Sequence, residues 1–294
     1  MKHYRLKYLF AICLGCICLY ACNPEIDQPV YLQVDTAMLS TVYYTQGTAS
    51  ANITDIWVTV NGKNMGVYEL PATIPVFASG NTNLQLTAGI KMNGLAIKRP
   101  LYPFYNVDIR NMDLVETMTY KLTPQFTYKE STDFEFKEDF EDAGVKFGPV
   151  DSSSNMVKTS DASLVFTFPN EKSRYSGMIQ LLPEDSTFFE VQTTKTFIKN
   201  SKMTYCFMEM NYNFTHNVEV GIYYHYNGRN YQYPICGIYG ASKNGRGWKK
   251  IYINLTEALN SSTMIKDFEI YFKGIKNKQD TAIYLFDNIK VLYI

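Results

Sequence analysis

The sequence has 294 residues, and its 28 basic and 28 acidic side chains give a formal net charge of zero. No basic patch stands out in the sequence, which argues against nucleic acid as the main partner. Tyrosine (24) and phenylalanine (18) are abundant, and aromatic residues combined with Asn-Gly turns are typical of β-strands. Composition therefore favours an all-β protein, and the length suits two β-domains of ordinary size.

The first residues have the form of a secretory signal peptide. Lys2, Arg5 and Lys7 make a basic start, and an uncharged apolar stretch follows from Tyr8 to Leu19. About 12 apolar residues are too few to cross a bilayer core of about 30 Å as a helix. No later segment offers about 18 consecutive apolar residues, so the sequence predicts no membrane-spanning helix.

The segment Leu19-Tyr20-Ala21-Cys22 resembles the lipobox of bacterial lipoproteins. The resemblance implies a lipoprotein signal peptide over residues 1–21 and acylation of Cys22, by which the chain would be anchored stably in a lipid bilayer. An ordinary signal peptide or a signal anchor is the alternative. Residues 22–29 are polar and contain two prolines, which predicts an extended tether. Their acidic residues resemble the surface-export signal of Bacteroidetes lipoproteins, which implies an outer-membrane protein exposed on the cell surface.

Only two cysteines, Cys206 and Cys236, lie outside the signal region. They could form one disulfide in an oxidising envelope, or they could be two small buried hydrophobic residues. Cys206 is in phase with Met208 and Met210 on a predicted strand, which favours free thiols. Two cysteines cannot build a structural zinc site.

Residues 30–126 are predicted to form a small N-terminal β-sandwich. Alternation over 56–60, an Asn61-Gly62 turn and a return strand over 63–68 indicate a hairpin. Pro71 and Pro75 place the segment between them at a sheet edge or in a crossover, because proline lacks a ladder donor. The stretch 58–76 resembles an immunoglobulin-like or PEGA-like module of bacterial envelope proteins, and such modules are expected to be spacers or interaction surfaces.

Residues 127–133 are polar and predicted to be a linker, and residues 134–294 are predicted to form a second β-domain. Strands are expected at 134–140, 163–168, 218–226, 230–235, 247–255, 268–272 and 283–292, with one short helix near 256–259. Phe140-Glu141, Gly247-Trp248-Lys249-Lys250-Ile251 and Leu285-Phe286-Asp287-Asn288-Ile289 occur in this order. They resemble the jelly-roll, galactose-binding-like domains of carbohydrate-binding modules. The resemblance implies a jelly-roll β-sandwich, although the same fold also serves purely structural roles.

Asp287 lies in phase with the apolar residues of the last predicted strand, so its carboxylate is expected to point toward the apolar face. A buried carboxylate needs a cation, a metal or backbone donors. In the domains that this part resembles, an acidic residue at this place and one from the first strand hold a structural calcium. The resemblance implies Glu141 or Asp142 as the partners, while capping of a bulge or bonding to backbone N–H groups is the alternative.

A run of aromatic residues around the Asn227-Gly228 turn suits sugar recognition. Tyr223, His225, Arg229 and Tyr231 are the candidate ligand-binding residues, because aromatic rings can stack on sugars while polar groups bond their hydroxyls. The alternative is an ordinary core with a tyrosine-rich surface, and Trp248 is expected in the core in either case.

The sequence contains no P-loop, no nucleophile elbow and no dinucleotide fingerprint, and outside the signal region its only histidines are His216 and His225. A non-catalytic protein is therefore expected. The sequence favours a membrane-anchored binding module for glycans. The alternative is a structural or accessory lipoprotein that binds other envelope proteins.

Overall fold

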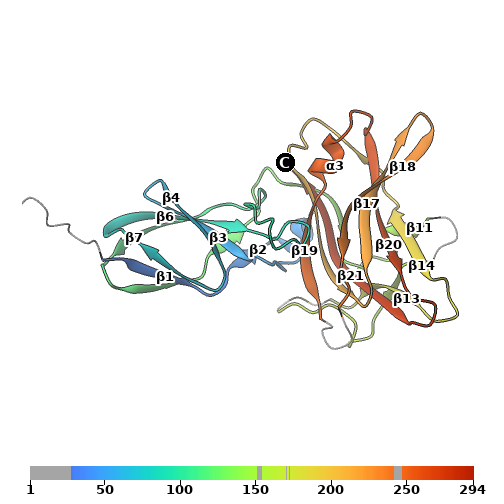
Figure 1. The fold of residues 1–294 in the computed structure, drawn as a ribbon, viewed down its shortest axis with the longest axis horizontal. Coiled ribbons are helices and arrows are strands. Elements are labelled where there is room, and N and C mark those ends of the chain that lie inside the picture. Colours follow the sequence, from blue (N-terminus) through green and yellow to red (C-terminus); the bar gives the residue numbers. More distant parts are fainter. Residues whose placement is uncertain (1–27, 151–153, 170, 172, 242–246) are drawn as a thin grey trace, which may run out of the picture.

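The computed structural model describes residues 28–150, 154–169, 171, 173–241 and 247–294. The predicted signal peptide, Cys22 and most of the predicted tether lie outside the described residues. The described chain forms two lobes joined end to end, a smaller N-terminal lobe and a larger C-terminal lobe (Figure 1). None of the helices in these described ranges is long and apolar enough to span a membrane.

The smaller lobe is built from short strands around one apolar core. In its hairpin, Asn61 and Gly62 have φ angles of 49° and 79°, as a type I′ turn requires. Its sheets have the orders β5 (Ala72–Val76)–β1 (Val30–Val34)–β8 (Thr119–Leu122), β4 (Lys63–Glu69)–β3 (Asp55–Val60)–β6 (Gly80–Gly89)–β7 (Asp108–Leu114), and β2 (Met38–Ser40)–β9 (Gln125–Thr127). Strand β5, which contains Pro75, lies at a sheet edge, as its prolines predict.

The larger lobe is a β-sandwich of two sheets, which confirms the all-β fold class. The first sheet has the order β12 (Val157–Thr159), β13 (Ser176–Leu181), β21 (Ala282–Tyr293), β16 (Cys206–Phe214) and β19 (Lys249–Asn254), and β10 (Asp133–Glu138) also pairs with β21. The second sheet has the order β11 (Phe147–Pro149), β14 (Phe188–Thr193), β20 (Asp267–Ile275), β17 (Val218–Tyr226) and β18 (Arg229–Ile238), and β15 (Phe197–Ile198) also pairs with β20.

Alternating apolar side chains from the two sheets fill the sandwich. Met208 and Met210 of β16 and Val220 and Ile222 of β17 are fully buried in this core. Cys206 is buried beside them, and both Cys206 and Cys236 are free thiols, as the strand phase favours. The predicted short helix is present as α3 (Thr256–Asn260), and α2 (Tyr43–Gln46) is a single turn that lies against the larger lobe, where Tyr43 bonds to Asp139.

The strand expected over residues 163–168 is absent, and this prediction was wrong. The Asp161 carboxylate accepts hydrogen bonds from the backbone N–H and hydroxyl of Ser163, at 2.9 and 2.7 Å. The backbone carbonyl of Asp161 also accepts the N–H groups of Leu164 and Val165. These bonds fold the start of the segment into a turn, because Asp favours local side-chain bonds over a strand ladder.

The lobes meet at a buried junction on the outer side of the first sheet. Phe207, Tyr252 and Leu292 of the larger lobe belong to the apolar core of the smaller lobe. Tyr102 packs against Phe207 and Tyr252, with ring centroids 5.7 and 4.8 Å apart. This contact fixes the two lobes relative to each other through side chains as well as through the connecting chain.

Candidate functional site

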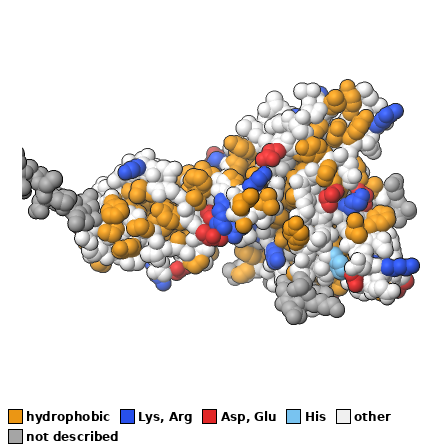
Figure 2. Space-filling view, in the orientation of Figure 1, with side chains coloured by type: hydrophobic (Ala, Val, Ile, Leu, Met, Phe, Trp, Pro, Cys, Tyr) orange, Lys and Arg blue, Asp and Glu red, His pale blue; other side chains and the backbone are white. Residues whose placement is uncertain are grey.

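The outer side of the second sheet carries a regular grid of polar side chains. Its members, here called the polar face, alternate with core residues along β14, β20, β17 and β18 and are Glu190, Gln192, Glu219, Tyr223, His225, Gln232, Glu269, Tyr271 and Lys273. The register places Tyr223 between Glu269 and Gln232, and Glu219 beside Lys273. Charged side chains of both signs lie next to one another on the larger lobe (Figure 2).

Tyr271 is the floor of the polar face. The register pairs it with Gly221, and a Cβ atom at Gly221 would lie 2.5 Å from the Tyr271 ring. The Tyr223 ring centroid is 5.0 Å from that of Tyr271, with an interplanar angle of 44°. Gly221 therefore lets one aromatic ring lie close to the sheet while the second, partly exposed ring packs beside it.

The carboxylates of the polar face hold these rings and the polar groups around them. Glu190 accepts hydrogen bonds from the Tyr223 hydroxyl and, at 2.9 Å, from Gln232 Nε2, and its other oxygen lies 3.3 Å from Lys273 Nζ. Glu219 accepts the Tyr271 hydroxyl at 2.8 Å. Burial and this bond raise the pKa of Tyr271 well above its usual value, so the phenol stays a neutral donor.

His225 lies at the other end of the polar face. Its Nδ1 is 2.9 Å from Asp267 Oδ1 and 3.9 Å from Glu269 Oε2. Its side chain is 40% exposed, so the ring edge that does not face Asp267 is available to a ligand.

A groove of about 820 Å³ continues the polar face at one end of the sheet. Glu219, Gln232 and Lys273 belong to both, and His216 and Asn217 line the far side of the groove. Donors and acceptors thus surround a hollow of the size that binds small ligands. The arrangement suits an uncharged ligand rich in hydroxyl groups, because carboxylate, amide and ammonium groups alternate across it.

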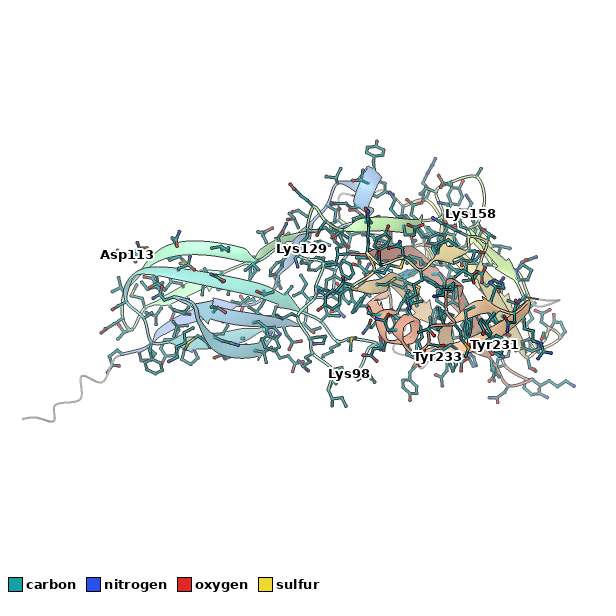
Figure 3. All side chains as sticks on the ribbon, turned by 90° about the horizontal axis from the view of Figure 1, so that it is seen from above. Lys98, Asp113, Lys129, Lys158, Tyr231 and Tyr233 are labelled. Carbon is teal, nitrogen blue, oxygen red and sulfur yellow. The ribbon has the colours of Figure 1, made fainter. Side chains whose placement is uncertain are left out.

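The structure separates the four predicted ligand-binding residues. Tyr223 and His225 lie on the polar face, but Tyr231 pairs with Tyr224 and Arg229 pairs with Tyr226 on the opposite side of the hairpin. The Tyr224 and Tyr231 rings are stacked at 5.3 Å. Tyr231 is seen on β18 next to Tyr233 in Figure 3. Period-two geometry explains the separation, since residues directly opposite across an antiparallel pair share a face.

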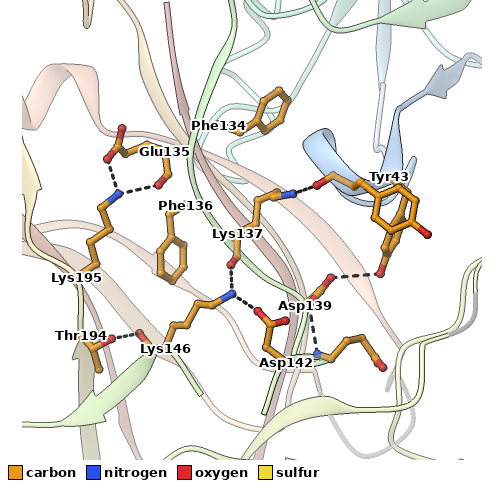
Figure 4. Close-up of a pocket in the computed structure, with 12 residues that line it drawn as sticks. Tyr43, Phe134, Glu135, Phe136, Lys137, Asp139, Asp142, Lys146, Thr194 and Lys195 are labelled. Atoms are coloured by element: carbon orange, nitrogen blue, oxygen red, sulfur yellow. Dashed lines mark hydrogen bonds and ion pairs between the residues drawn. The ribbon is translucent and has the colours of Figure 1, made fainter. Parts of the chain in front are cut away.

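Two of the three predicted metal ligands lie at a pocket of about 620 Å³ between α2 and β10 (Figure 4). The Lys146 ammonium is 2.7 Å from an Asp142 oxygen. The Glu141 carboxylate accepts the backbone N–H groups of Arg174 and Tyr175, at 2.7 and 3.0 Å, and lies 3.0 Å from Arg174 Nε. Both carboxylates are thus already occupied by protein donors.

Asp287, the third predicted ligand, is fully buried on the outer side of the first sheet. Asn288 has a φ angle of 49° and shifts the register, so Leu285 and Asp287 leave the core side that Ile289 occupies. The expected phase was therefore wrong. Ser176 Oγ donates to Asp287 at 2.5 Å and the Asn288 N–H at 2.7 Å, in agreement with the bulge-capping alternative.

The three predicted ligands do not fit a calcium site as the described side chains are placed. Within the described ranges, no group of three His, Cys, Asp or Glu side chains lies close enough together to hold a metal ion. Calcium stays a prediction, and no step of the proposed function depends on it.

Sequence reasoning missed Glu190, which joins Tyr223 to Gln232 and Lys273, because it assigned no strand to residues 188–193. The alternation of Phe189 and Val191 with Glu190 and Gln192 is a period-two signal that could have found this strand. Trp248 was also misplaced, since it is half-buried at a groove between the lobes and not in the core.

No family model matches the sequence, and no curated protein matches it. Among solved structures, a carbohydrate-binding module of the β-sandwich superfamily is similar over 80% of this chain and 84% of that chain, with 10% identity and a TM-score of 0.39. A xylan-binding domain of family 22 is similar over 54% of this chain and 94% of its own, with 10% identity and a TM-score of 0.35.

A family 11 carbohydrate-binding module from Clostridium thermocellum, in complex with a β-1,3-1,4-mixed-linked tetrasaccharide, is similar over 52% of this chain and 92% of its own. Its identity is 13% and its TM-score is 0.34. Similarity of this degree does not show which ligand this chain binds.

Proposed function

We propose that the protein is a lipid-anchored, surface-exposed binding protein of the outer membrane, which holds glycans on its polar face without converting them. The observation that carries the glycan part is the grid in which Tyr223, Gln232 and Glu219 lie together beside the groove. Sugar rings present C–H faces to aromatic rings and hydroxyls to carboxylates and amides, and this surface offers both kinds of partner.

Binding by a preformed surface suits the hydrogen bonds already present. Glu190 and Gln232 are linked to each other, and Glu219 is linked to Tyr271, so their positions are fixed before a ligand arrives. A ligand then loses less free energy to the ordering of protein side chains.

The test is a glycan-array screen of the full chain carrying Cys22→Ser, followed by titration of any hit. Tyr223→Ala and Gln232→Ala are each expected to weaken binding about tenfold or more, because they remove the ring and an amide of the site. Tyr231→Ala is the matched control, since Tyr231 lies on the opposite side of the same hairpin. Equal losses for Tyr223→Ala and Tyr231→Ala, or a blank array with folded protein, would contradict the proposal.

The anchor is tested separately. Metabolic labelling with a palmitate analogue is expected to label the wild-type chain and to leave Cys22→Ser unlabelled, because the thioether forms on that sulfur. Labelling that persists in Cys22→Ser would show that Cys22 is not the anchor and would leave the glycan proposal intact.

A further inference from the structure

A second groove, of about 540 Å³, lies at the junction of the two lobes. This junction groove is lined from the smaller lobe by Ser50, Ala51, Asn52, Lys91 and Gly94, and from the larger lobe by Phe166, Thr167, Phe168, Asn211, Tyr212, Trp248, Lys249, Lys250 and Ile251. It shares no residue with the polar face.

Contacts between the lobes fix the walls of the junction groove. The Asn52 N–H donates to the Tyr252 hydroxyl at 2.9 Å, and Asn52 Nδ2 donates to the Lys250 carbonyl at 3.3 Å. Asn211 Nδ2 donates to Ser50 Oγ at 2.9 Å. The groove is therefore a preformed feature of the two-lobe molecule, and neither lobe makes it alone.

One wall of the junction groove is aromatic. The Trp248 ring packs edge-on against Phe166, with centroids 5.3 Å apart and an interplanar angle of 78°. Phe168 lies nearly parallel to Phe166 at 6.4 Å. Phe166 is buried, whereas Trp248 and Phe168 keep part of their surface exposed, so these two rings can contact a ligand.

The other lining residues carry ammonium, amide or hydroxyl groups, or are small or aliphatic. Lys91, Lys249 and Lys250 line the junction groove, and none of its described lining residues is acidic. Lys250 pairs with the buried Glu209 at 3.0 Å and Lys91 with Glu69 at 3.1 Å, while Lys249 is exposed. In Figure 2, Lys and Arg side chains lie at the junction of the lobes beside Asp and Glu side chains.

Asn211 adds a buried acceptor that has no partner among the described residues. Its side chain is only 3% exposed, and its Oδ1 atom has no hydrogen-bond partner among the described residues, although its Nδ2 atom is bonded to Ser50. A buried acceptor without a partner costs free energy, and a donor from a bound ligand would remove that cost.

We propose that the junction groove is a second binding site, which takes an anionic sugar of the uronic acid class. The sugar ring lies against Trp248 and Phe168, and a hydroxyl donates to Asn211 Oδ1. Its carboxylate lies at the edge of the sheet, where the exposed Lys249, which shares the other face of the edge strand β19 with Ile251, can reach it. The polar face carries three glutamates, Glu190, Glu219 and Glu269, against one lysine, Lys273, and therefore disfavours the same anion. The two sites thus differ in the charge of the sugar that each accepts, and this inference does not depend on the proposed function of the polar face.

The experiment uses the full chain carrying Cys22→Ser and Trp57→Phe. The sequence has two tryptophans, so Trp248 becomes the only tryptophan reporter. Trigalacturonate is expected to change its fluorescence in a saturable manner, and neutral galactotriose at the same concentrations is expected to leave it unchanged. Higher ionic strength should weaken the response to trigalacturonate, because the attraction is partly between charges.

Lys249→Ala is expected to weaken trigalacturonate binding about tenfold, since charge-assisted hydrogen bonds are the strong ones. Lys98→Ala is the matched control, because Lys98 is an exposed lysine near the junction that does not line the groove (Figure 3). Tyr223→Ala should bind trigalacturonate normally, which separates this site from the polar face. No response to trigalacturonate, an equal response to galactotriose, or unchanged binding by Lys249→Ala would overturn the proposal.

Discussion

Glu209 is a fully buried carboxylate at the junction of the lobes. Its Oε1 atom accepts the hydroxyls of Tyr102 and Tyr128, at 2.7 and 2.8 Å, and its Oε2 atom lies 3.0 Å from Lys250 Nζ. Burial alone would raise the pKa of Glu209, but the nearby charges of Lys250 and Lys290 lower it, so the carboxylate is ionised. The residue therefore supplies the counter-charge of the buried Lys250, while burial lowers the pKa of the neighbouring Lys290 to about 7.

Glu209→Gln is expected to lower the free energy of unfolding by about 3–5 kcal/mol, because it leaves the buried Lys250 ammonium without its counter-charge. Chemical denaturation followed by circular dichroism measures this change. Asp35→Asn is the control, since Asp35 makes an exposed pair with Lys121 at 3.7 Å, and no measurable change is expected there. A Glu209→Gln protein as stable as the wild type would show that Lys250 loses its charge at little cost.

Asp287 makes stability depend on pH. Burial raises its pKa to about 8, from 3.8 for an ordinary aspartate, with smaller contributions from Asp139 and Glu141. Between these pH values the unfolded chain has lost the proton and the folded chain keeps it, so the free energy of unfolding falls as pH rises from about 4 to 8. Above about pH 8 the loss is complete.

Asp287→Asn is therefore expected to be more stable than the wild type at pH 8, by on the order of a few kcal/mol, and nearly equal to it at pH 4. Thermal melts in chelator at both pH values test this, with the exposed Asp113→Asn as the control (Figure 3). A rise in melting temperature on adding calcium, seen in the wild type and absent in Asp287→Asn, would instead support the calcium prediction, because a cation keeps the carboxylate ionised.

The close packing of Tyr271 on the β17–β18 hairpin requires a glycine at position 221. A Cβ atom there would lie 2.4 Å from the Tyr233 carbonyl oxygen as well as 2.5 Å from the Tyr271 ring. Gly221→Ala is expected to destabilise the protein by about 1–3 kcal/mol and to weaken glycan binding, since Tyr271 must move. Gly237→Ala, on the partner strand, meets no atom within 4 Å and should leave the denaturation midpoint unchanged. Equal behaviour of the two variants would argue against a close packing of Tyr271 on the sheet.

The two lobes are expected to unfold together in one cooperative transition. Phe207 of the larger lobe is 3% exposed and packs against Tyr102 and Phe104 of the smaller lobe, at 5.7 and 5.6 Å. Wild-type protein should therefore show one calorimetric transition, and Phe207→Ala, which costs about 3–5 kcal/mol at the interface, should show two. Phe188→Ala is the control because Phe188 is 44% exposed on β14, away from this contact. Two transitions in the wild type would mean that the lobes are only loosely coupled.

Local patterns in the sequence specify the all-β class and several of the longer strands. Alternation along 56–60 and 218–226, with Asn-Gly turns at 61–62 and 227–228, depends on side chains that are neighbours along the chain, so local rules suffice. The same alternation put Tyr223 and His225 on one face of a strand. It failed at residues 163–168, where Asp161 folds the chain into a turn.

Which residues form a site depends on contacts between distant segments of the chain. The Tyr224–Tyr231 register placed two of the four predicted ligand-binding residues on the other side of the hairpin, and Glu190 reached Tyr223 from a strand 33 positions away. The bulge at Asn288 reversed the side on which Asp287 lies, and the docking of the lobes created the junction groove beside Trp248. Pairing register, bulges and domain contacts arise between segments far apart in the chain, so no local pattern specifies them.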